Sequence, residues 1–359
     1  MKIEVIYGGA GTGKTYSLLQ RINSLVTNDY IVLAPTHTAV RNLLARSSIE
    51  DDKFATIYSY FRIDYENDDV IGAIKNYNYI FIDEFGLIKK ELFRKIINWL
   101  ERNNRDVTLT IAGDVVQLSP IYLEERSIPF PKLRKHYERE FAHVIEHDFN
   151  SIFSLSTIRK AEKTLLTKNF RSNSDVLNLI WNIFYEMKVD QIKYITITKA
   201  VALILQTGAT FISSRYSHHE TIYELMKQQL LMTKECKIVN KLVFYEGAQF
   251  LIAENTKEYR NGDIVTFSHI INNTVYFKED KHWSGEFKLL PLQLLTAHKS
   301  QGLSIENVIV CVDDMFDPCM FYTMCTRTIS HLYFFKYKDI DLQPYLQQFH
   351  QLLEYYKYI

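Results

Sequence analysis

The residues best suited to chemistry stand near the start of the chain, in the stretch Gly8–Thr15, which reads GGAGTGKT. It fits the phosphate-binding pattern G-x-x-x-x-G-K-[ST], in which glycines let successive backbone N–H groups point at phosphate oxygens. Lys14 is expected to reach the β- and γ-phosphates of a nucleotide, and the Thr15 hydroxyl to bind Mg²⁺. The alternative is a glycine-rich turn that binds nothing. The flanking pattern disfavours it, because an apolar strand precedes the loop and apolar residues at helical spacing follow it.

Two adjacent carboxylates, Asp83 and Glu84, form the next pattern with clear chemistry. They follow Tyr79–Ile82, an apolar run typical of a central strand, and so stand at its carboxyl end. Beside a phosphate-binding loop, the first acid at this place orders the Mg²⁺ shell and the second polarises the attacking water. Acid pairs also end strands without such a role, so this interpretation depends on the loop upstream. Gln117, after a later strand, could contact the γ-phosphate and a water, unless it belongs to a simple turn.

Polar and aromatic residues follow other predicted strands. Thr36-His37-Thr38 comes directly after the apolar run Tyr30–Ala34, where hydroxyls and backbone amides could hold phosphates. Thr36 could equally be only the N-cap of the next helix. Within Thr56–Phe61, hydroxyls and rings could contact nucleic-acid bases or belong to the core, with equal weight.

Arginines in the second half of the chain could supply positive charge to a phosphate. Arg171 could reach a γ-phosphate across an interdomain cleft, while its neighbour Phe170 could cover an adenine ring. Arg327 is a second candidate at the end of a predicted helix, where its alternative role is a cation that satisfies the helix dipole. The loop His298–Gly302 is dense in donors suited to phosphate or sugar contacts.

The elements that must position these residues alternate between short apolar strands and helices in the first half. This predicts an α/β fold with a parallel sheet covered by helices on both faces. Charged, irregular residues 121–160 lead to a second domain. There the pattern predicts a strand over 200–212, a helix over 221–232 and small antiparallel strands over 243–287. The tail, 342–359, predicts an amphipathic helix packed on the second domain.

The composition sets outer limits on function. The 359 residues are enough for two or three domains, each with its own core. Lys plus Arg and Asp plus Glu number 42 each, so a nucleic-acid surface must be a local basic patch. The four cysteines show no metal-binding spacing and are expected to be reduced thiols. Without a signal peptide or an apolar run of membrane-spanning length, we expect a soluble, cytoplasmic protein with no membrane partner.

Taken together, these signals resemble superfamily 1 helicases over nearly the whole chain. The similar segments are Gly8–Thr15 (motif I), Ala34–Val40 (Ia), Thr56–Phe61 (Ib), Asp83-Glu84 (II), Gly113–Gln117 (III), Asn169–Ser172 (IV), Thr296–Gly302 (V) and Tyr322–Arg327 (VI). The motif V loop, with a small β insertion before it, is most similar to the 1B branch that includes Dda and RecD helicases.

This resemblance implies two RecA-like parallel-sheet domains, 1–160 and 161–359. It also implies a short insertion near 60–78 in the first domain and a small SH3-like β subdomain near 243–290 in the second. The implied activity is ATP-dependent movement along single-stranded DNA, 5′→3′, by closure of the cleft on ATP and Mg²⁺. We expect a monomer, with replication or recombination proteins as further partners.

The resemblance, carried over position by position, implies four sets of site residues. The catalytic residues are Lys14, Glu84, Gln117, Arg171 and Arg327. The nucleotide-binding residues are Gly9, Ala10, Gly11, Thr12, Gly13, Lys14, Thr15, Tyr16, Phe170 and Gly302. The metal ligands are Thr15 and Asp83. The nucleic-acid-binding residues are Pro35, Thr36, His37, Ser59, Tyr60, Phe61, Thr296, His298 and Lys299.

Two features depart from the family pattern. The sequence starts directly at the first strand, without the glutamine-containing segment that recognises adenine, so we expect hydrolysis of several NTPs. The segment between motifs Ib and II is short, so any strand-separating pin must be small. Three alternatives stay open: a viral superfamily 1 RNA helicase, a non-unwinding translocase or switch subunit, and a metabolic phosphate-loop kinase. The kinase would need an acceptor site in place of the paired arginines.

Overall fold

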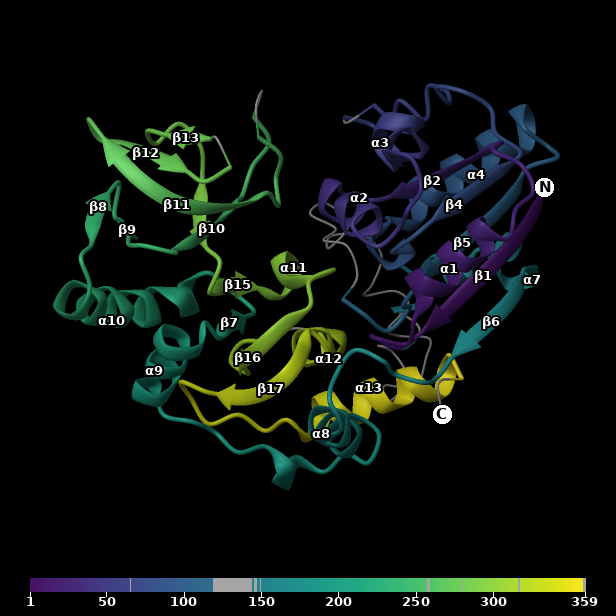
Figure 1. Cartoon of the computed structure of the whole chain (residues 1–359). Helices are drawn as coiled ribbons and strands as arrows, with labels where there is room; N and C mark the ends of the chain where they lie inside the picture. Colours follow the sequence, from purple (N-terminus) through teal and green to yellow (C-terminus); the bar gives the residue numbers. More distant parts are fainter. Residues whose placement is uncertain are drawn as a thin grey trace.

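The computed structural model describes residues 1–64, 66–118, 144, 147–148, 150–256, 259–279, 281–315 and 317–357. Its first lobe is built on an all-parallel sheet in the order β3-β2-β4-β5-β1-β6 (Figure 1). The strands are β1 (Lys2–Gly8), β2 (Tyr30–Ala34), β3 (Phe54–Thr56), β4 (Tyr79–Ile82), β5 (Thr108–Gly113) and β6 (Glu162–Leu166). The neighbouring strands β2 (YIVLA) and β4 (YIFI) are apolar along their whole length, as is typical of a parallel sheet with helices on both faces.

The last strand of this sheet corrects the predicted domain boundary. Strand β6 pairs in parallel with β1, so the first sheet extends to Leu166 rather than ending at residue 160. Its sequence, EKTLL, is only half apolar, and its residues are exposed or half-buried, as suits an edge strand. The apolar pattern therefore did not distinguish it from the linker. Of the irregular stretch predicted over 121–160, residues 121–143 lie outside the described residues.

Two helices of the first lobe begin at a threonine that caps them. Thr36 accepts a hydrogen bond from the Ala39 N–H at the start of α2, and Thr56 caps α3 through the Ser59 N–H. The helices are α1 (Lys14–Asn23), α2 (His37–Leu44), α3 (Ile57–Tyr60), α4 (Lys90–Asn103) and α7 (Ser156–Lys160). The insertion that follows α3 is small, held by a bridge between Ile63 and Val70 and by ion pairs from Lys89 and Lys95 of this lobe.

The second lobe has a parallel sheet in the order β15-β7-β16-β17. The strands are β7 (Thr210–Ser213), β15 (Leu294–Thr296), β16 (Ile305–Cys311) and β17 (Thr328–Phe335). The helices are α8 (Ser174–Phe184), α9 (Ile197–Thr207), α10 (Ser217–Thr233), α11 (Ala297–Ser300), α12 (Pro318–Cys325) and α13 (Gln343–Tyr355).

The strand predicted over 200–212 is wrong for most of its length. Residues up to Thr207 form α9, and only the last part forms β7. Thr196 caps the helix through the Lys199 N–H, and Gly208 ends it in the left-handed conformation (φ +67°). A short apolar run bounded by polar residues cannot be assigned to strand or helix by pattern alone, because both bury it completely.

A small antiparallel barrel is inserted between β7 and β15, at the upper left of Figure 1. Its strand order is β13-β12-β11-β10-β14, and a two-stranded hairpin, β8-β9, precedes it. The strands are β8 (Lys237–Val239), β9 (Leu242–Phe244), β10 (Gln249–Ile252), β11 (Ile264–Ile271), β12 (Thr274–Phe277), β13 (His282–Trp283) and β14 (Leu289–Pro291). The barrel has its own core around Phe244, Phe250 and Trp283.

One hydrophobic cluster joins the two lobes, whereas separate cores were predicted. It contains Val5 and Ile111 of the first sheet together with Phe321 of α12 and Phe349 of α13. The C-terminal helix therefore packs on the second lobe as predicted and also reaches the first, where Tyr356, at its end, contacts Phe153. In the described part of the chain, none of the helices is long and apolar enough to span a bilayer.

Candidate active site

The phosphate-binding loop has the conformation that its glycines allow. Gly11 and Gly13 have φ angles of +76° and +84°, which favour glycine, and α1 starts directly behind them. Lys14 is buried, and its ammonium donates to the carbonyl oxygens of Gly8 (3.0 Å) and Gly9 (2.8 Å). Burial lowers the Lys14 pKa, while Asp114 and Glu84 act in the opposite sense. The loop thus offers a preorganised cation and a helix N-terminus to a phosphate.

The same loop is tied to the second lobe. The Ala10 N–H donates to the hydroxyl of Tyr322 (3.1 Å), and the Asn169 amide donates to the Ala10 carbonyl (2.7 Å). The Phe170 N–H donates to the carbonyl of Gly11 (2.8 Å). Motifs IV and VI therefore hold the backbone of motif I directly.

Asp83 and Thr15 form a compact pair of oxygen donors. The Thr15 hydroxyl donates to Asp83 (2.7 Å), and Asp83 is buried at the end of β4. Burial, and next the charge of Glu84, raise the pKa of Asp83 to about 7. A hydroxyl and a carboxylate suit Mg²⁺, which prefers oxygen ligands and retains waters and phosphates as further ligands. The described residues contain no cluster of three or more His, Cys, Asp or Glu that could hold a metal.

A cleft of about 470 Å³ brings residues of both lobes together. Thr15, Asp83 and Glu84 line it from the first lobe, and Arg171 and Gly302 from the second. Glu84 has a left-handed backbone (φ +56°), an unusual conformation for a non-glycine residue that recurs at functional sites.

Arg171 enters this cleft while held by its own lobe. Its guanidinium donates to the Thr326 carbonyl (3.1 Å). Burial lowers the Arg171 pKa, and Glu84 opposes that shift. The second predicted arginine, Arg327, is fully buried, and its guanidinium donates to the Thr323 carbonyl (3.0 Å) and the Thr326 hydroxyl (3.3 Å). Burial, and next the charge of Arg171, lower the Arg327 pKa to about 10. Arg171 thus faces the acids, whereas Arg327 is engaged by the end of α12.

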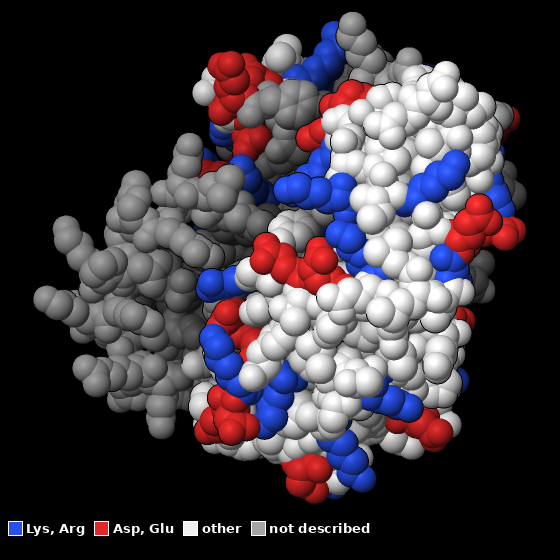
Figure 2. All heavy atoms as spheres, turned by 90° about the vertical axis from the view of Figure 1, so that its left-hand side faces the viewer, with Lys and Arg blue, Asp and Glu red and all other residues white. Residues whose placement is uncertain are grey.

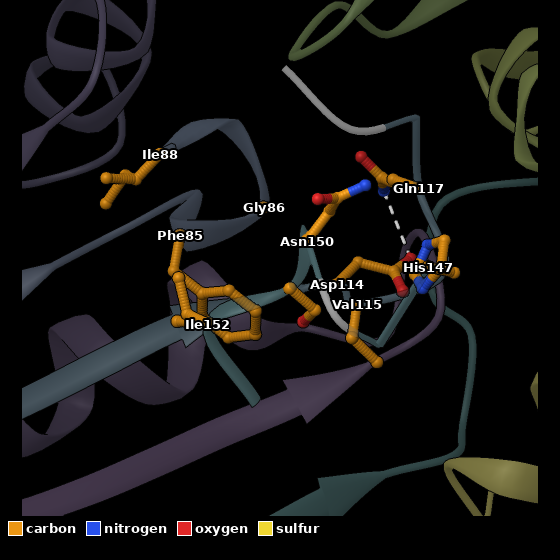
Figure 3. A pocket seen from close by; sticks show the side chains of 10 residues that line it. Phe85, Gly86, Ile88, Asp114, Val115, Gln117, His147, Asn150 and Ile152 are labelled. Atoms are coloured by element: carbon orange, nitrogen blue, oxygen red, sulfur yellow. Dashed lines mark hydrogen bonds between the residues drawn. The ribbon is translucent and has the colours of Figure 1, made fainter. Parts of the chain in front are cut away.

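Gln117 lines a neighbouring cavity of about 300 Å³ rather than this cleft. Its amide donates to Asp114 (3.2 Å), which is almost completely buried and also accepts from the Val116 N–H. Figure 3 shows the Gln117–Asp114 bond, with Asn150 on the same side of the cavity. Gln117 is therefore positioned by Asp114, next to motif II but not within the lining of the cleft.

Two residues predicted to bind nucleic acid are core residues instead. Tyr60 is 2% exposed and Phe61 is fully buried, with their rings 4.8 Å apart and edge to face. The Tyr60 hydroxyl donates to the Lys75 carbonyl (2.7 Å), which pins the short insertion. Neither ring can stack on a base, because α3 turns both toward α4 and the insertion. Ser59, on the same turn, is exposed.

The other predicted nucleic-acid residues lie at the strand ends on both lobes. Pro35 is half-buried, and Thr36 and His37 are exposed at the start of α2, with Thr36 acting as the N-cap that was weighed as its alternative role. Thr296 is buried at the end of β15, and His298 and Lys299 are half-buried on α11. Burial lowers the pKa of His298 and, together with Lys288, that of Lys299.

Exposed rings border the phosphate-binding loop. Phe170 is 68% exposed, next to Gly13, with the Lys168 ammonium 5.1 Å from its ring centre. Tyr16, predicted to contact the nucleotide, is 67% exposed on α1. Both rings are thus available to a base, as the prediction for Phe170 requires.

Several functional contacts were not predicted as site residues. Tyr322 and Asn169 bond the loop, and Asp114 positions Gln117. Asn42 on α2 and Arg46, just after that helix, line the cleft. Asn169 and Tyr322 lie inside recognisable motifs, so these motifs could have identified both as site residues. Nothing in the local sequence marks Asn42 or Arg46, because their role depends on where motif V lies, and Asn42 donates to the carbonyl of Gly302 (3.2 Å).

Comparisons with known proteins agree with this architecture. A family model described as an AAA domain matches residues 1–122, and no curated protein matches the sequence. The chain is similar to solved Bacteroides Pif1 bound to single-stranded DNA (18% identity, TM-score 0.64, 99% of this chain and 93% of that chain). It is also similar to a structure of two coordinating Pif1 helicases unwinding forked double-stranded DNA (19%, 0.62, 99% and 94%). The structure of Candida albicans Pif1 is similar as well, with 15% identity and a TM-score of 0.58 over 99% of this chain and 95% of that chain. The chain therefore has the fold of Pif1 helicases, which confirms the predicted α/β fold class with two parallel-sheet domains.

Proposed function

We propose that the protein is an ATP-dependent helicase that moves along single-stranded DNA. One observation carries the proposal: acids of the first lobe and an arginine of the second line a single cleft beside a phosphate-binding loop. Catalysis of phosphoryl transfer depends on such placement of charge, and an arginine supplied across an interface contributes about 10³–10⁵ in rate. The proposal is also supported by similarity in fold to a Bacteroides Pif1 solved with ADP-AlF3 and single-stranded DNA.

In this mechanism, each residue at the cleft has one task. The loop amides and Lys14 bind the phosphates, and Thr15 and Asp83 hold Mg²⁺, which neutralises phosphate charge when bound. Glu84 accepts the proton of the attacking water, and Arg171 stabilises the charge that develops on the γ-phosphate. Phe170 covers the base. Because the groups come from two lobes, hydrolysis requires the lobes to be close, and each cycle of closure moves one lobe along the strand.

The direction and the assembly belong to the same proposal. We place this chain with the 5′→3′ helicases, acting as a monomer on ATP with Mg²⁺. The exposed ring of Phe170, without a polar side chain aimed at the base among its described contacts, favours the use of several NTPs.

The test is ATP hydrolysis with and without a single-stranded oligonucleotide. Glu84→Gln and Lys14→Ala should each lower the stimulated rate by about 10³-fold or more, since each removes a group that acts in the transition state. Glu101→Gln, an exposed acid on α4, is the matched control and should hydrolyse normally. A Glu84→Gln protein with an undiminished rate would contradict the assigned base.

Forked duplexes with either a 5′ or a 3′ tail then decide polarity and unwinding. Strand separation only from the 5′ tail supports the proposal. Stimulated hydrolysis without any separation would favour a non-unwinding translocase. Stimulation by RNA but not by DNA of the same sequence would favour a viral-type RNA helicase.

A further inference from the structure

A loop of the barrel reaches across to the first lobe. Asp263, which precedes β11, forms an ion pair with Arg41 of α2. Beside it, Gly262 lies so close to α2 that a Cβ there would come within 2.0 Å of the Thr38 hydroxyl oxygen. Only a residue without a side chain allows this approach, and the φ angle of Gly262 (+94°) also favours glycine. We call Arg260–Asp263 the barrel loop.

The same loop also binds motif V. The Lys299 ammonium of α11 donates to the side-chain oxygen of Asn261 (2.7 Å). The barrel loop therefore engages one cation on each lobe, Arg41 on the first and Lys299 on the second. Asn42, the neighbour of Arg41, contacts Gly302 in the same motif V segment. The barrel loop, α2 and motif V therefore meet along one seam.

Positive charge is concentrated along this seam. After burial, the charges of Arg260 and Arg41 lower the His37 pKa, and Lys288 contributes to lowering that of Lys299. Asp263 is the acid at the centre, since it also accepts from Lys281 (3.0 Å). On the face shown in Figure 2, basic and acidic side chains are interspersed, and side chains of both signs border the hollow at its middle.

We infer that Arg41 and Lys299 form a binding site for nucleic-acid phosphates, and that the barrel loop occupies this site while no strand is bound. The Asp263 carboxylate and the Asn261 amide oxygen take the places of two phosphate oxygens. This deepens the proposed function and rests on it.

Guanidinium groups bind carboxylates and phosphates with the same planar fork, so one can replace the other without moving Arg41. The Asp263 side chain is 9% exposed while that of Arg41 is 41% exposed, so the arginine is open to an incoming strand. Capture of a strand then releases the barrel loop from α2. A strand must compete with the loop, which lowers its apparent affinity by the fraction of free protein in the occupied state.

A double-mutant cycle on Asp263 and Arg41 tests this inference in the full chain. Dissociation constants for a fluorescent oligothymidylate are measured at low salt for the wild type, Asp263→Asn, Arg41→Gln and the double variant. Asp263→Asn should bind about threefold tighter or more, and Arg41→Gln should bind more weakly with a smaller salt slope. In the Arg41→Gln background, Asp263→Asn should leave the dissociation constant unchanged, because the arginine for which the loop and the strand compete is then missing. Glu246→Gln, an exposed acid on the barrel, is the charge control and should bind as the wild type does.

Because Asp263 also accepts from the Arg260 N–H and Lys281, its substitution loosens the barrel as well, so a second measurement leaves Asp263 intact. In Gly262→Ala, the added Cβ would meet the Thr38 hydroxyl and push the barrel loop off α2. This variant should therefore bind oligothymidylate about threefold tighter or more. Gly247→Ala, at another left-handed glycine whose Cβ would meet nothing within 4 Å, is the matched control and should bind as the wild type does.

The inference alone is overturned by tighter binding of Asp263→Asn that persists without Arg41, or by equal binding of Gly262→Ala and Gly247→Ala. An Asp263→Asn protein that binds no tighter than the wild type overturns it as well. If neither the wild type nor any variant binds single strands or hydrolyses ATP faster with them, the proposed function fails, and the inference fails with it.

Discussion

Asp83 and Arg171 carry opposite charges in the same cleft, and burial disfavours the charged form of both. The Asp83 pKa rises to about 7, while the Arg171 pKa falls from its usual range. Charges held this way gain strength from their low-dielectric surroundings and need little reorganisation during the reaction. Such a pair of groups suits the strongly anionic γ-phosphate of the proposed reaction.

Substitution of Arg171 tests the division of labour between the lobes. Arg171→Ala should lower the strand-stimulated kcat by about 10³-fold, because it removes charge stabilisation needed only in the transition state. Nucleotide affinity, measured by titration with a fluorescent ATP analogue, should change little. Arg94→Ala, in an exposed ion pair on α4, is the control. A large loss of affinity at normal kcat would assign Arg171 to ground-state binding instead.

Helix α12 connects three motifs within two of its turns. Tyr322 accepts from Ala10 of motif I, and Thr323 accepts from the Leu118 N–H after motif III (2.9 Å). Arg327, just beyond the helix, donates back to the Thr323 carbonyl. One helix therefore connects the phosphate-binding loop, the residue after motif III and Arg327.

Removal of the Tyr322 hydroxyl should loosen this connection. Tyr322→Phe leaves the Ala10 N–H without its acceptor in a buried place, at a cost of about 1–2 kcal/mol. We expect the KM for ATP to rise about five- to tenfold, with a smaller effect on the unfolding temperature without nucleotide. Tyr345→Phe is the matched control, because it too loses a hydroxyl bonded to the backbone, in this case one that donates to a carbonyl. This variant should keep the KM of the wild type. An unchanged KM in Tyr322→Phe would make the contact structural only.

Helix α10 is attached to the second sheet by a buried histidine. His219 shares its Nε2 between the Ser213 hydroxyl (2.8 Å) and the Leu295 carbonyl (3.2 Å). Burial lowers its pKa to about 4, below that of the unfolded chain. The folded state therefore holds His219 neutral, and the unfolded state takes up its proton first on acidification.

The sign of the resulting pH dependence follows directly. The stability from neutral His219 is fully present above pH 6.5 and is lost as the pH falls toward 4. Between pH 7 and 4.5, the free energy of unfolding of the wild type should fall by about 2 kcal/mol more than that of His219→Gln. Urea unfolding at both pH values measures this difference. His331→Gln, exposed on β17, should follow the wild type, and parallel curves for all three proteins would refute the assignment.

One hydrophobic core extends through both lobes of the molecule. Phe349 of the last helix is fully buried, stacks on Tyr322 (4.6 Å) and meets Phe184 edge to face (5.3 Å). The cluster that contains it continues to Val5 and Ile111 beneath the first sheet. The two lobes are therefore joined by one continuous hydrophobic cluster.

Unfolding measurements should show that the two lobes share one hydrophobic core. Phe349→Ala should lower the free energy of unfolding by about 3–5 kcal/mol through loss of burial and the cavity left behind. Differential scanning calorimetry should show the two lobes melting in one transition that moves as a whole. Trp181→Ala, at a half-exposed ring on α8, should cost much less. Two resolved transitions, with only one displaced by Phe349→Ala, would show that the lobes unfold independently.

Local patterns determined much of the site. The phosphate-binding loop and the acids after β4 were identified because each follows a strand whose apolar pattern is visible within a few residues. Arg171 was identified from the short stretch Asn169–Ser172, which resembles motif IV. Other features escaped for physical reasons. The edge strand β6 lacks an apolar run, α9 and a buried strand look alike, and the rings of Tyr60 and Phe61 differ from stacking residues only in the direction in which α3 points them.

By itself, then, the sequence determined which residue types stand at the strand ends of the first lobe. From these residue types it followed that a nucleotide could be bound and cleaved. The tertiary structure alone decided which of them meet. Tyr322 lies 312 residues from Ala10, and Asp263 lies on a different lobe from Arg41. Such contacts leave no periodicity in the chain, because packing and charge pairing between distant elements depend on the assembled fold rather than on neighbours in sequence.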